Sequence, residues 1–246
     1  MRAIVSDIHA NLEAIEAVLA HIRQLGVEQI YCLGDIVGYG PDPLACLDIA
    51  MQFDACVLGN HDQAAIFDTE GFNANAERAI FWTRERLELD QTDQARVRWD
   101  FLCEMPRSLS EDGVQFVHGS VRNPLNDYLF PEDIYNTQKM EKAFALVQKH
   151  VYQGHTHVPG VFAAGPSFMR PADIDNVFRL GNKKAMINVG SVGQPRDGDS
   201  RACYVIVDDE TVTFHRVPYD AEKTARKIHA ISDLDNSLGD RLLEGR

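Results

Sequence analysis

The sequence AIVSDIHAN at residues 3–11 decides the fold class. It begins as a short apolar run, typical of a buried strand, and becomes polar at Asp7. From Asn11 to Leu25, apolar residues recur at spacings of three and four, which predicts a helix with one buried face. Gly26, a residue typical of helix C-termini, precedes a second apolar run, Gln29–Leu33. Short apolar runs that alternate with helical stretches predict an α/β fold.

The same alternation continues to the end of the chain. Further apolar runs predict strands at 55–58, 114–117, 150–153, 185–189, 202–207 and 211–217. A short polar link, Asp208–Glu210, joins the last two and predicts a hairpin. Helical patterns occupy 75–89, 93–102, 131–149 in two pieces, and 221–231. We expect one domain, 1–246, whose polar tail from about residue 232 frays.

The composition restricts the partners of this chain. It has 246 residues, enough to bury a large core without disulfides or a structural metal. Its 24 Lys and Arg against 37 Asp and Glu give a formal net charge of −13. Long nucleic acid is disfavoured as a partner, because such binding depends on basic side chains. Small phosphorylated substrates stay open, since bound metal ions would reverse the local charge.

Cysteine usage and hydropathy indicate the compartment. The five cysteines are scattered and form no C-x-x-C pair, which favours reduced, mostly buried thiols. The N-terminus lacks the apolar run of a signal peptide. No stretch reaches the roughly 18 apolar residues of a membrane span. We therefore expect a cytoplasmic protein without a membrane partner.

Polar clusters adjoin five of the predicted strands. They are Asp7 with His9; Gly34 with Asp35; Gly59, Asn60, His61 and Asp62; His118 with Gly119; and Gly154, His155, Thr156 and His157. Ligands of α/β folds bind at the carboxyl ends of strands, so we expect the clusters to converge. Carboxylates, imidazoles and a carboxamide without thiolates suit divalent Mn, Fe, Zn, Co or Ni. The donors are too many for one tetrahedral zinc, which predicts two adjacent ions.

Each cluster has a simpler interpretation when it is taken alone. Asp7 and Asp35 are suited to capping helices, Asn60 to a turn, and His118 to a structural hydrogen bond. Recurrence of the clusters at successive strand ends favours the metal site over these separate roles. The four histidines outside the clusters are expected to be surface or packing residues, and these are His21, His150, His215 and His229.

The ordered set of motifs resembles the calcineurin-like metallophosphoesterase superfamily. The family's order is kept by DIH at 7–9, GD at 34–35, GNHD at 59–62, HG at 118–119 and GHTH at 154–157. Similarity to a bacterial and archaeal branch of predicted phosphodiesterases adds SDIHAN at 6–11, GYGPDP at 38–43 and GSVGQPR at 190–196. The resemblance implies a four-layer α/β/β/α sandwich, in which two mixed sheets face each other and a dimetal site lies at the carboxyl ends of strands.

The resemblance also implies the ligands of two divalent ions per chain. The first ion would take Asp7, His9 and His157; the second would take Asn60, His118 and His155; Asp35 would bridge them. A water that bridges the two ions would become the hydroxide nucleophile. His61, which is no metal ligand in the family, would stabilise the phosphoryl transition state or protonate the leaving group. Asp62 would hydrogen-bond His61 and hold it charged.

Substrate contacts are less defined than the ligands. Asn11, Tyr39 and Arg196 are candidate substrate-binding residues from their place in the motifs, although Asn11 and Arg196 are as well suited to tying down loops. The irregular stretches 120–131 and 158–184 are candidate substrate walls. The apolar residues 128–130 fit the core better than a pocket lining.

We therefore expect a hydrolase of small phosphate esters, a phosphodiesterase or phosphatase, with nucleotides and phosphoproteins among its candidate substrates. The alternative is a non-catalytic binding module with the same fold. The presence of His61 beside all seven ligand positions favours the enzyme. The sequence leaves open the physiological substrate, the preference for monoesters or diesters, the identity of the metals and the oligomeric state.

Overall fold

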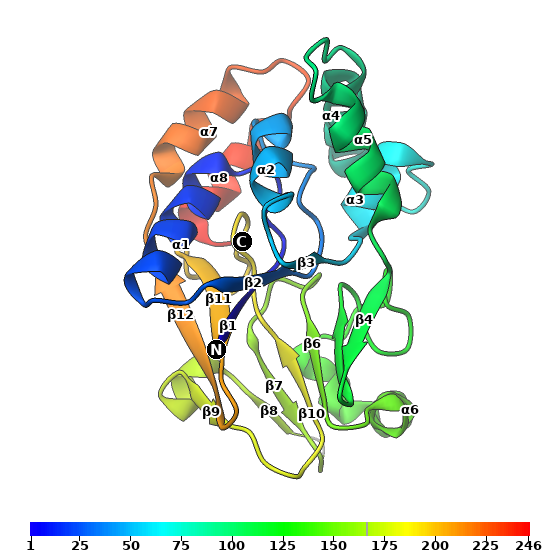
Figure 1. Ribbon diagram of the computed structural model, residues 1–246, viewed down its shortest axis with the longest axis vertical. Coiled ribbons are helices and arrows are strands. Elements are labelled where there is room, and N and C mark those ends of the chain that lie inside the picture. Colours follow the sequence, from blue (N-terminus) through cyan, green and yellow to red (C-terminus); the bar gives the residue numbers. More distant parts are fainter. Residues whose placement is uncertain (166) are drawn as a thin grey trace.

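Two mixed six-stranded sheets lie face to face, and helices cover their outer sides (Figure 1). The computed structural model describes residues 1–165 and 167–246. The helices α1, α2, α7 and α8 gather at one side, and α6 lies beside the strands of the second sheet. The layers follow the order α/β/β/α, so the predicted fold class is confirmed.

The first sheet has the strand order β3-β2-β1-β11-β12-β9. Its strands are β1 Arg2–Val5, β2 Gln29–Cys32, β3 Ala55–Cys56, β9 Val177–Arg179, β11 Ala202–Val207 and β12 Thr211–Val217. β1, β2 and β3 are parallel, whereas β11 pairs antiparallel with both β1 and β12. The predicted hairpin over Asp208–Glu210 is thereby confirmed.

The second sheet has the strand order β4-β5-β6-β10-β7-β8. Its strands are β4 Ser108–Glu111, β5 Val114–Val117, β6 His150–Gln153, β7 Gly160–Ala163, β8 Ser167–Met169 and β10 Ala185–Asn188. β5, β6 and β10 are parallel. Each sheet thus contributes a set of parallel strands, and their carboxyl ends carry the polar clusters.

The helices occupy the expected regions and three further ones, those of α2, α3 and α8. They are α1 Leu12–Gln24, α2 Pro43–Ala50, α3 Asn60–Ile66, α4 Ala74–Glu88, α5 Ala95–Glu104, α6 Thr137–Leu146, α7 Ala221–His229 and α8 Ser237–Glu244, with the 3-10 turns η1 Pro131–Tyr135 and η2 Pro171–Ile174. α2 and α3 were not predicted, because α2 follows a turn-rich stretch and α3 begins inside a polar cluster. α3 matters most, because Asn60 and His61 form its first turn.

The core consists of a layer between the sheets and a layer beneath the helices. Between the sheets, Ile4 and Val205 of the first sheet belong to one buried cluster with Phe116 and Ile187 of the second. Beneath the helices, the buried face of α1 includes Ile15 and packs on the outer side of the first sheet. This double burial holds the two sheets, and therefore their carboxyl ends, in one arrangement.

The C-terminal tail is ordered where fraying was expected. Leu238 and Leu242 of α8 are 1% and 3% exposed and belong to a cluster with Tyr39 and Trp82. They stand four residues apart and so share one helix face. The segment is short and mostly polar or charged, so the two leucines alone did not indicate a buried helix face. The tail therefore packs next to a residue that the motifs placed at the site.

The stretch 158–184 is also more regular than expected. It contains β7, β8, η2 and β9, while residue 166 lies outside the described residues. β7 and β8 form one edge of the second sheet, and β9 forms one edge of the first. The strands are only three or four residues long, so apolar alternation could not develop. Most of this stretch completes the sheets rather than forming a substrate wall.

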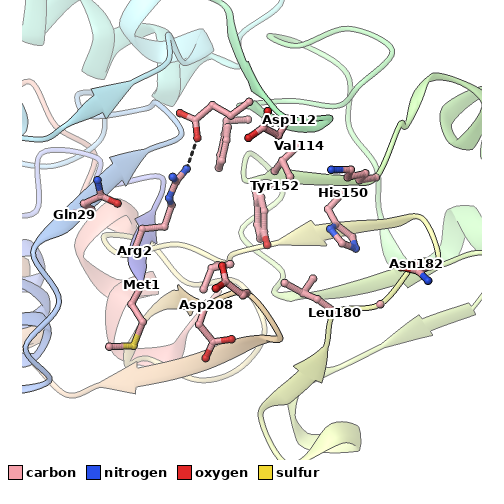
Figure 2. Close-up of a pocket in the computed structure, with 16 residues that line it drawn as sticks. Met1, Arg2, Gln29, Asp112, Val114, His150, Tyr152, Leu180, Asn182 and Asp208 are labelled. Atoms are coloured by element: carbon pink, nitrogen blue, oxygen red, sulfur yellow. Dashed lines mark hydrogen bonds and ion pairs between the residues drawn. The ribbon is translucent and has the colours of Figure 1, made fainter.

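A cavity of about 590 Å³ lies where the strands begin, at the ends opposite to the polar clusters, and Figure 2 shows the residues that line it. It is lined by the first residues of β1, β2 and β6, which are Arg2, Gln29 and His150. Arg2 pairs there with Glu111 at 2.6 Å. Because the clusters follow the last residues of these strands, this cavity is separate from them.

Two smaller findings concern thiols and helices. Four of the five cysteines are buried, and all five are free. Among the described residues, no helix combines the length and apolar character that a bilayer crossing requires.

Because the core lies between the sheets, we expect two valines of the first sheet to contribute differently to the stability of the protein. Val205 is fully buried, whereas Val177 is 40% exposed. Val205→Ala is expected to lower the free energy of unfolding by about 2 kcal/mol, because it removes buried methyl groups and leaves a cavity. Val177→Ala, its control, is expected to change it by about 0.5 kcal/mol or less. Urea denaturation of both variants measures the effect, and equal losses would contradict this account of the core.

Candidate metal centre

The five polar clusters converge at one end of the two sheets. Their loops are joined by backbone hydrogen bonds, from Asp7 N to Gly34 O at 3.0 Å and from Gly154 N to His118 O at 3.0 Å. Seven side chains predicted as ligands meet there, and none is more than 8% exposed: Asp7, His9, Asp35, Asn60, His118, His155 and His157. Groups that the sequence separates by up to 150 residues thus share one buried volume.

The first group of donors consists of Asp7, His9 and His157. Their ligand atoms all lie within 4.8 Å of one another. Asp7 Oδ1 lies 3.2 Å from His157 Nε2 and 3.9 Å from His9 Nε2. The two Nε2 atoms are 3.1 Å apart. This is the spacing of atoms that can surround one small cation.

The second group consists of Asn60, His118 and His155. Asn60 Oδ1 and His155 Nδ1 each lie 2.9 Å from His118 Nε2. Asp35 lies between the groups, with Oδ2 3.6 Å from His9 Nε2 and 3.3 Å from His118 Nε2. One carboxylate oxygen can therefore reach both groups, which is the geometry of a bridging ligand.

The imidazole tautomers show that the donors fit cations. Nδ1 of His9, His118 and His157 lies 3.2, 2.9 and 2.6 Å from the carbonyl oxygens of Val37, Leu33 and Gln194, respectively. A carbonyl only accepts, so each Nδ1 carries a proton and each ring turns Nε2 toward the centre, with a free lone pair in the neutral rings of His9 and His157. Two bare lone pairs 3.1 Å apart repel each other, and a cation between them removes the repulsion.

The charge states of the side chains in the site also suit metal binding. Burial opposes ionisation of Asp7 and Asp35, but the surrounding imidazoles outweigh it and hold both carboxyl pKa values well below the usual range. Burial lowers the pKa of His9 and His157, and it lowers the pKa of His155 to about 3. These groups are therefore carboxylates and neutral imidazoles, the forms that bind metals.

His118 differs from the other imidazoles. Burial opposes its charge, but Asp35 above all outweighs burial and raises its pKa to about 9. A field that attracts a proton to Nε2 also attracts a metal cation to the same lone pair. The carboxylate between the two groups therefore favours positive charge in the second group.

The backbone is strained where the donors stand. Non-glycine residues with φ in the left-handed region include Asp7 at 54°, His9 at 47°, Asp35 at 52°, His155 at 66° and His157 at 61°. Such conformations are uncommon for residues other than glycine and cluster at functional sites. Each allows a side chain to turn inward directly after a strand, and the packed sheets on either side hold it there.

Two glycines permit the close approach of the loops. A Cβ at Gly59 would stand 2.1 Å from Asp35 Oδ1, and one at Gly154 would stand 2.4 Å from Asp7 Oδ2. Any side chain at these positions would displace a carboxylate of the site. The glycines next to the ligand positions are therefore explained by contact between loops.

His61 lies beside the donors and is surrounded by rings. Its ring centroid is 4.4 Å from that of Tyr39, 4.9 Å from that of His9 and 4.9 Å from that of Phe72. Nδ1 of His61 is buried and has no partner among the described residues. Burial lowers its pKa to about 4. His61 is thus a neutral imidazole with an unused polar atom at the edge of the centre.

Asp62 does not hydrogen-bond His61 as we expected. Its Oδ1 accepts from Ile36 N at 2.9 Å and Val37 N at 3.1 Å, and its Oδ2 accepts from Gly59 N at 3.1 Å. Burial, aided by the charge of Asp35, raises the pKa of Asp62 to about 7. Asp62 instead fastens the loop of Asp35 to the start of α3.

The three candidate substrate contacts have different surroundings. Asn11 caps α1, and all its polar atoms are occupied, by Ala14 N, Thr224 Oγ1, Gly193 O and Tyr219 Oη. Tyr39 is 8% exposed, with its ring 4.8 Å from that of His9. The guanidinium of Arg196 lies 5.9 Å from the Tyr39 ring centroid and hydrogen-bonds Gln194 Oε1 at 2.7 Å. Arg196 and Tyr39 therefore adjoin the first group, while Asn11 has no free donor.

The sequence did not indicate two neighbours of the site. Tyr128 stacks on His155 with centroids 3.8 Å apart, and Phe130 stacks on Tyr128 at 5.4 Å. Tyr128 and Phe130 are each 42% exposed, so only Leu129 of residues 128–130 belongs to the core. Phe72 likewise reaches His61 from the loop before α4. No local pattern distinguishes an aromatic residue on a loop that packs on a ligand from one that packs elsewhere.

Comparison with known proteins gives one consistent result. The family model of the calcineurin-like phosphoesterase superfamily domain matches residues 1–211. The uncharacterized protein MJ0912 of Methanocaldococcus jannaschii is 34% identical, with 100% of this chain and 98% of that protein covered. The crystal structure of a metallophosphoesterase from Sphaerobacter thermophilus is 34% identical with a TM-score of 0.83, and covers 100% of this chain and 98% of its own. Hypothetical protein PH1004 from Pyrococcus horikoshii shares the fold at 20% identity, with a TM-score of 0.77 and coverage of 100% and 99%.

The three backbone contacts of Asp62 predict a structural role. Asp62→Ala leaves three buried N–H groups without an acceptor, and each unsatisfied group costs roughly 1–3 kcal/mol of stability. We expect the free energy of unfolding of the metal-free protein to fall by about 3 kcal/mol or more in urea denaturation. Asp93→Ala, which changes an exposed acid, serves as the control. Unchanged stability in Asp62→Ala would show that these contacts do not hold the loops.

Proposed function

Because this chain belongs to the calcineurin-like phosphoesterase superfamily, we propose that it hydrolyses small phosphate esters at a pair of divalent cations. Asp7, His9 and His157 would hold the first cation, Asn60, His118 and His155 would hold the second, and Asp35 would contribute to both. One observation carries this proposal: two groups of three donors face each other across Asp35 Oδ2, with the Nε2 lone pairs directed inward. Seven oxygen and nitrogen donors without sulfur suit Mn, Fe, Zn, Co or Ni.

Divalent cations held by these residues would supply Lewis acidity to a phosphoryl oxygen and a source of hydroxide near neutral pH. The residues of the chain orient the reaction. His61 adjoins the first group, since one of its ring nitrogens lies within 4.8 Å of ligand atoms of His9 and Asp35, so its imidazole can hydrogen-bond a phosphoryl oxygen there. Its low pKa makes it a neutral hydrogen-bond partner rather than a charged one at neutral pH.

Arg196 provides the positive charge outside the donor groups. Its guanidinium lies 5.9 Å from the centroid of the Tyr39 ring, which itself packs on His9, and its charge adds to the effect of burial in lowering the pKa values of His9, His61 and His157. A guanidinium in this position can bind a phosphoryl oxygen of the substrate. Gln194 Oε1 fixes its direction, and the carbonyl of Gln194 fixes His157. The segment 190–196 thereby couples a proposed substrate contact to a proposed ligand.

The metal proposal predicts a dependence on Asp35. The wild-type chain, freed of metal and reloaded with Mn, is expected to hold two ions after gel filtration. Asp35→Asn removes the charge between the two groups and is expected to lower the content to one ion or fewer. Elemental analysis by mass spectrometry measures this, with Asp112→Asn, an exposed acid at the far end, as the control. Two retained ions in Asp35→Asn would contradict the bridging role.

The role of His61 predicts a loss of turnover without a loss of metal. His61→Ala is expected to lower kcat by roughly 10²–10³-fold, as for removal of a donor to the developing charge. The measurement compares p-nitrophenyl phosphate with bis-p-nitrophenyl phosphate on the Mn-loaded protein, which also separates monoesterase from diesterase activity. His229→Ala, at a histidine 38% exposed on its side chain, is the control. Turnover within about threefold of wild type would refute the role.

A further inference from the structure

A groove of about 350 Å³ opens beside the second donor group. Its walls come from α3, from the loop that links α3 to α4, and from the loop 120–131. The lining residues that matter are Asn60, Phe67, Asp68, Glu70, Phe72 and Asn126. It is distinct from the larger cavity of Figure 2, which lies at the other ends of the strands.

The groove adjoins both parts of the proposed reaction centre. Asn60 lines it, and Asn60 Oδ1 lies 2.9 Å from His118 Nε2 in the second donor group. Phe72 lines it as well, and its ring packs edge-on against His61 at 4.9 Å. A substituent on a phosphate at the centre can therefore extend into this groove.

The groove carries negative charge that the protein does not neutralise. Asp68 and Glu70 are both exposed, and neither takes part in an ion pair among the described residues. No Lys, Arg or His lines the groove. The nearby Arg84 is engaged by the carbonyl oxygens of Ala64, Ala65 and Phe67. A second phosphate in the groove would meet two carboxylates and no positively charged side chain, so the charge selects against anionic substituents.

Two aromatic rings complete the groove. Phe67 is 60% exposed, and Phe72 lines the groove from the other end of the same short loop. Aromatic faces attract ammonium groups through the ring quadrupole, and carboxylates add to this attraction. Aromatic rings together with unpaired acids, without any cation, are the chemistry of a site for an organic cation.

The side of the centre away from the groove carries positive charge. Arg196 stands over Tyr39, beside His9 of the first donor group. The centre is therefore polarised, with a guanidinium near the first group and two carboxylates near the second. A phosphodiester with one cationic substituent matches this polarity, because its anionic phosphate and its ammonium group fall on opposite sides.

We infer that the groove binds the ester substituent of the substrate and that this substituent carries an ammonium group, as in phosphate esters of amino alcohols. The inference deepens the proposed hydrolase function and rests on it for the position of the phosphate. Asp68, Glu70, Phe67 and Phe72 are then specificity residues.

The test compares two diesters that differ only in charge. p-Nitrophenyl phosphorylcholine carries a trimethylammonium group, and p-nitrophenyl 3,3-dimethylbutyl phosphate carries a tert-butyl group of the same shape. We expect kcat/KM of the Mn-loaded wild type to be about tenfold higher for the cationic ester at low salt. This ratio should fall toward one in Asp68→Asn/Glu70→Gln and at high ionic strength, since the carboxylates are exposed. Asp112→Asn/Asp209→Asn changes the net charge equally at the far end and should keep the wild-type ratio.

A binding arm separates failure of the groove from failure of the proposed function. Titration calorimetry compares two analogues that cannot be hydrolysed at the ester position, 2-(trimethylammonio)ethylphosphonate and 3,3-dimethylbutylphosphonate. Tighter binding of the cationic analogue, lost in Asp68→Asn/Glu70→Gln, supports the groove even if no diester is hydrolysed. Hydrolysis of both diesters with a ratio near one overturns the groove and leaves the hydrolase intact. Equal binding of the two analogues, or binding of neither, also overturns it.

Discussion

The arrangement of the site depends on buried imidazole lone pairs that face one another. Backbone carbonyls hold the protons of His9, His118 and His157 on Nδ1, which directs each Nε2 at a shared centre and leaves those of His9 and His157 bare. Such an arrangement is costly in a desolvated site, and the carboxylates of Asp7 and Asp35 add buried negative charge. Two bound divalent cations would resolve both problems at once. The strained φ values of the ligand residues and the direct contacts at Gly59 and Gly154 are the backbone consequences of bringing these groups together.

The sandwich makes this convergence possible because it faces two sets of parallel strands toward each other. Asp7, Asp35 and Asn60 follow parallel strands of one sheet, and His118 and His155 follow parallel strands of the other. Each donor group takes members from both sheets, so neither sheet alone would complete either group. The buried layer between the sheets, with Ile4 and Val205 on one side and Phe116 on the other, therefore holds the donors of each group together. Stability of the core and geometry of the site are linked through this layer.

Much of this arrangement could be predicted from the sequence, for identifiable reasons. The strands before the clusters are short apolar runs that end abruptly in polar residues, so β1, β2, β5 and β6 were predicted within a residue or two. The seven donors were predicted because their types and order are restrictive together. Features that depend on packing between distant segments were not predictable. The helix α8 lies in a charged tail, and its two buried residues, Leu238 and Leu242, are recognisable only from their packing in the cluster that contains Tyr39. Asp62 was expected to hydrogen-bond His61, but its carboxylate instead accepts hydrogen bonds from three backbone N–H groups. The stacking of Tyr128 on His155 depends on the fold and has no local signal in the sequence.

The central claim is that these seven donors hold two adjacent cations. Crystals of the Mn-loaded protein would test it through anomalous diffraction above and below the manganese absorption edge. The account predicts two anomalous peaks roughly 3.5–4 Å apart, one in each donor group, with Asp35 Oδ2 between them. A single peak, peaks that lie outside the two groups, or no peak in crystals grown with excess Mn would contradict it.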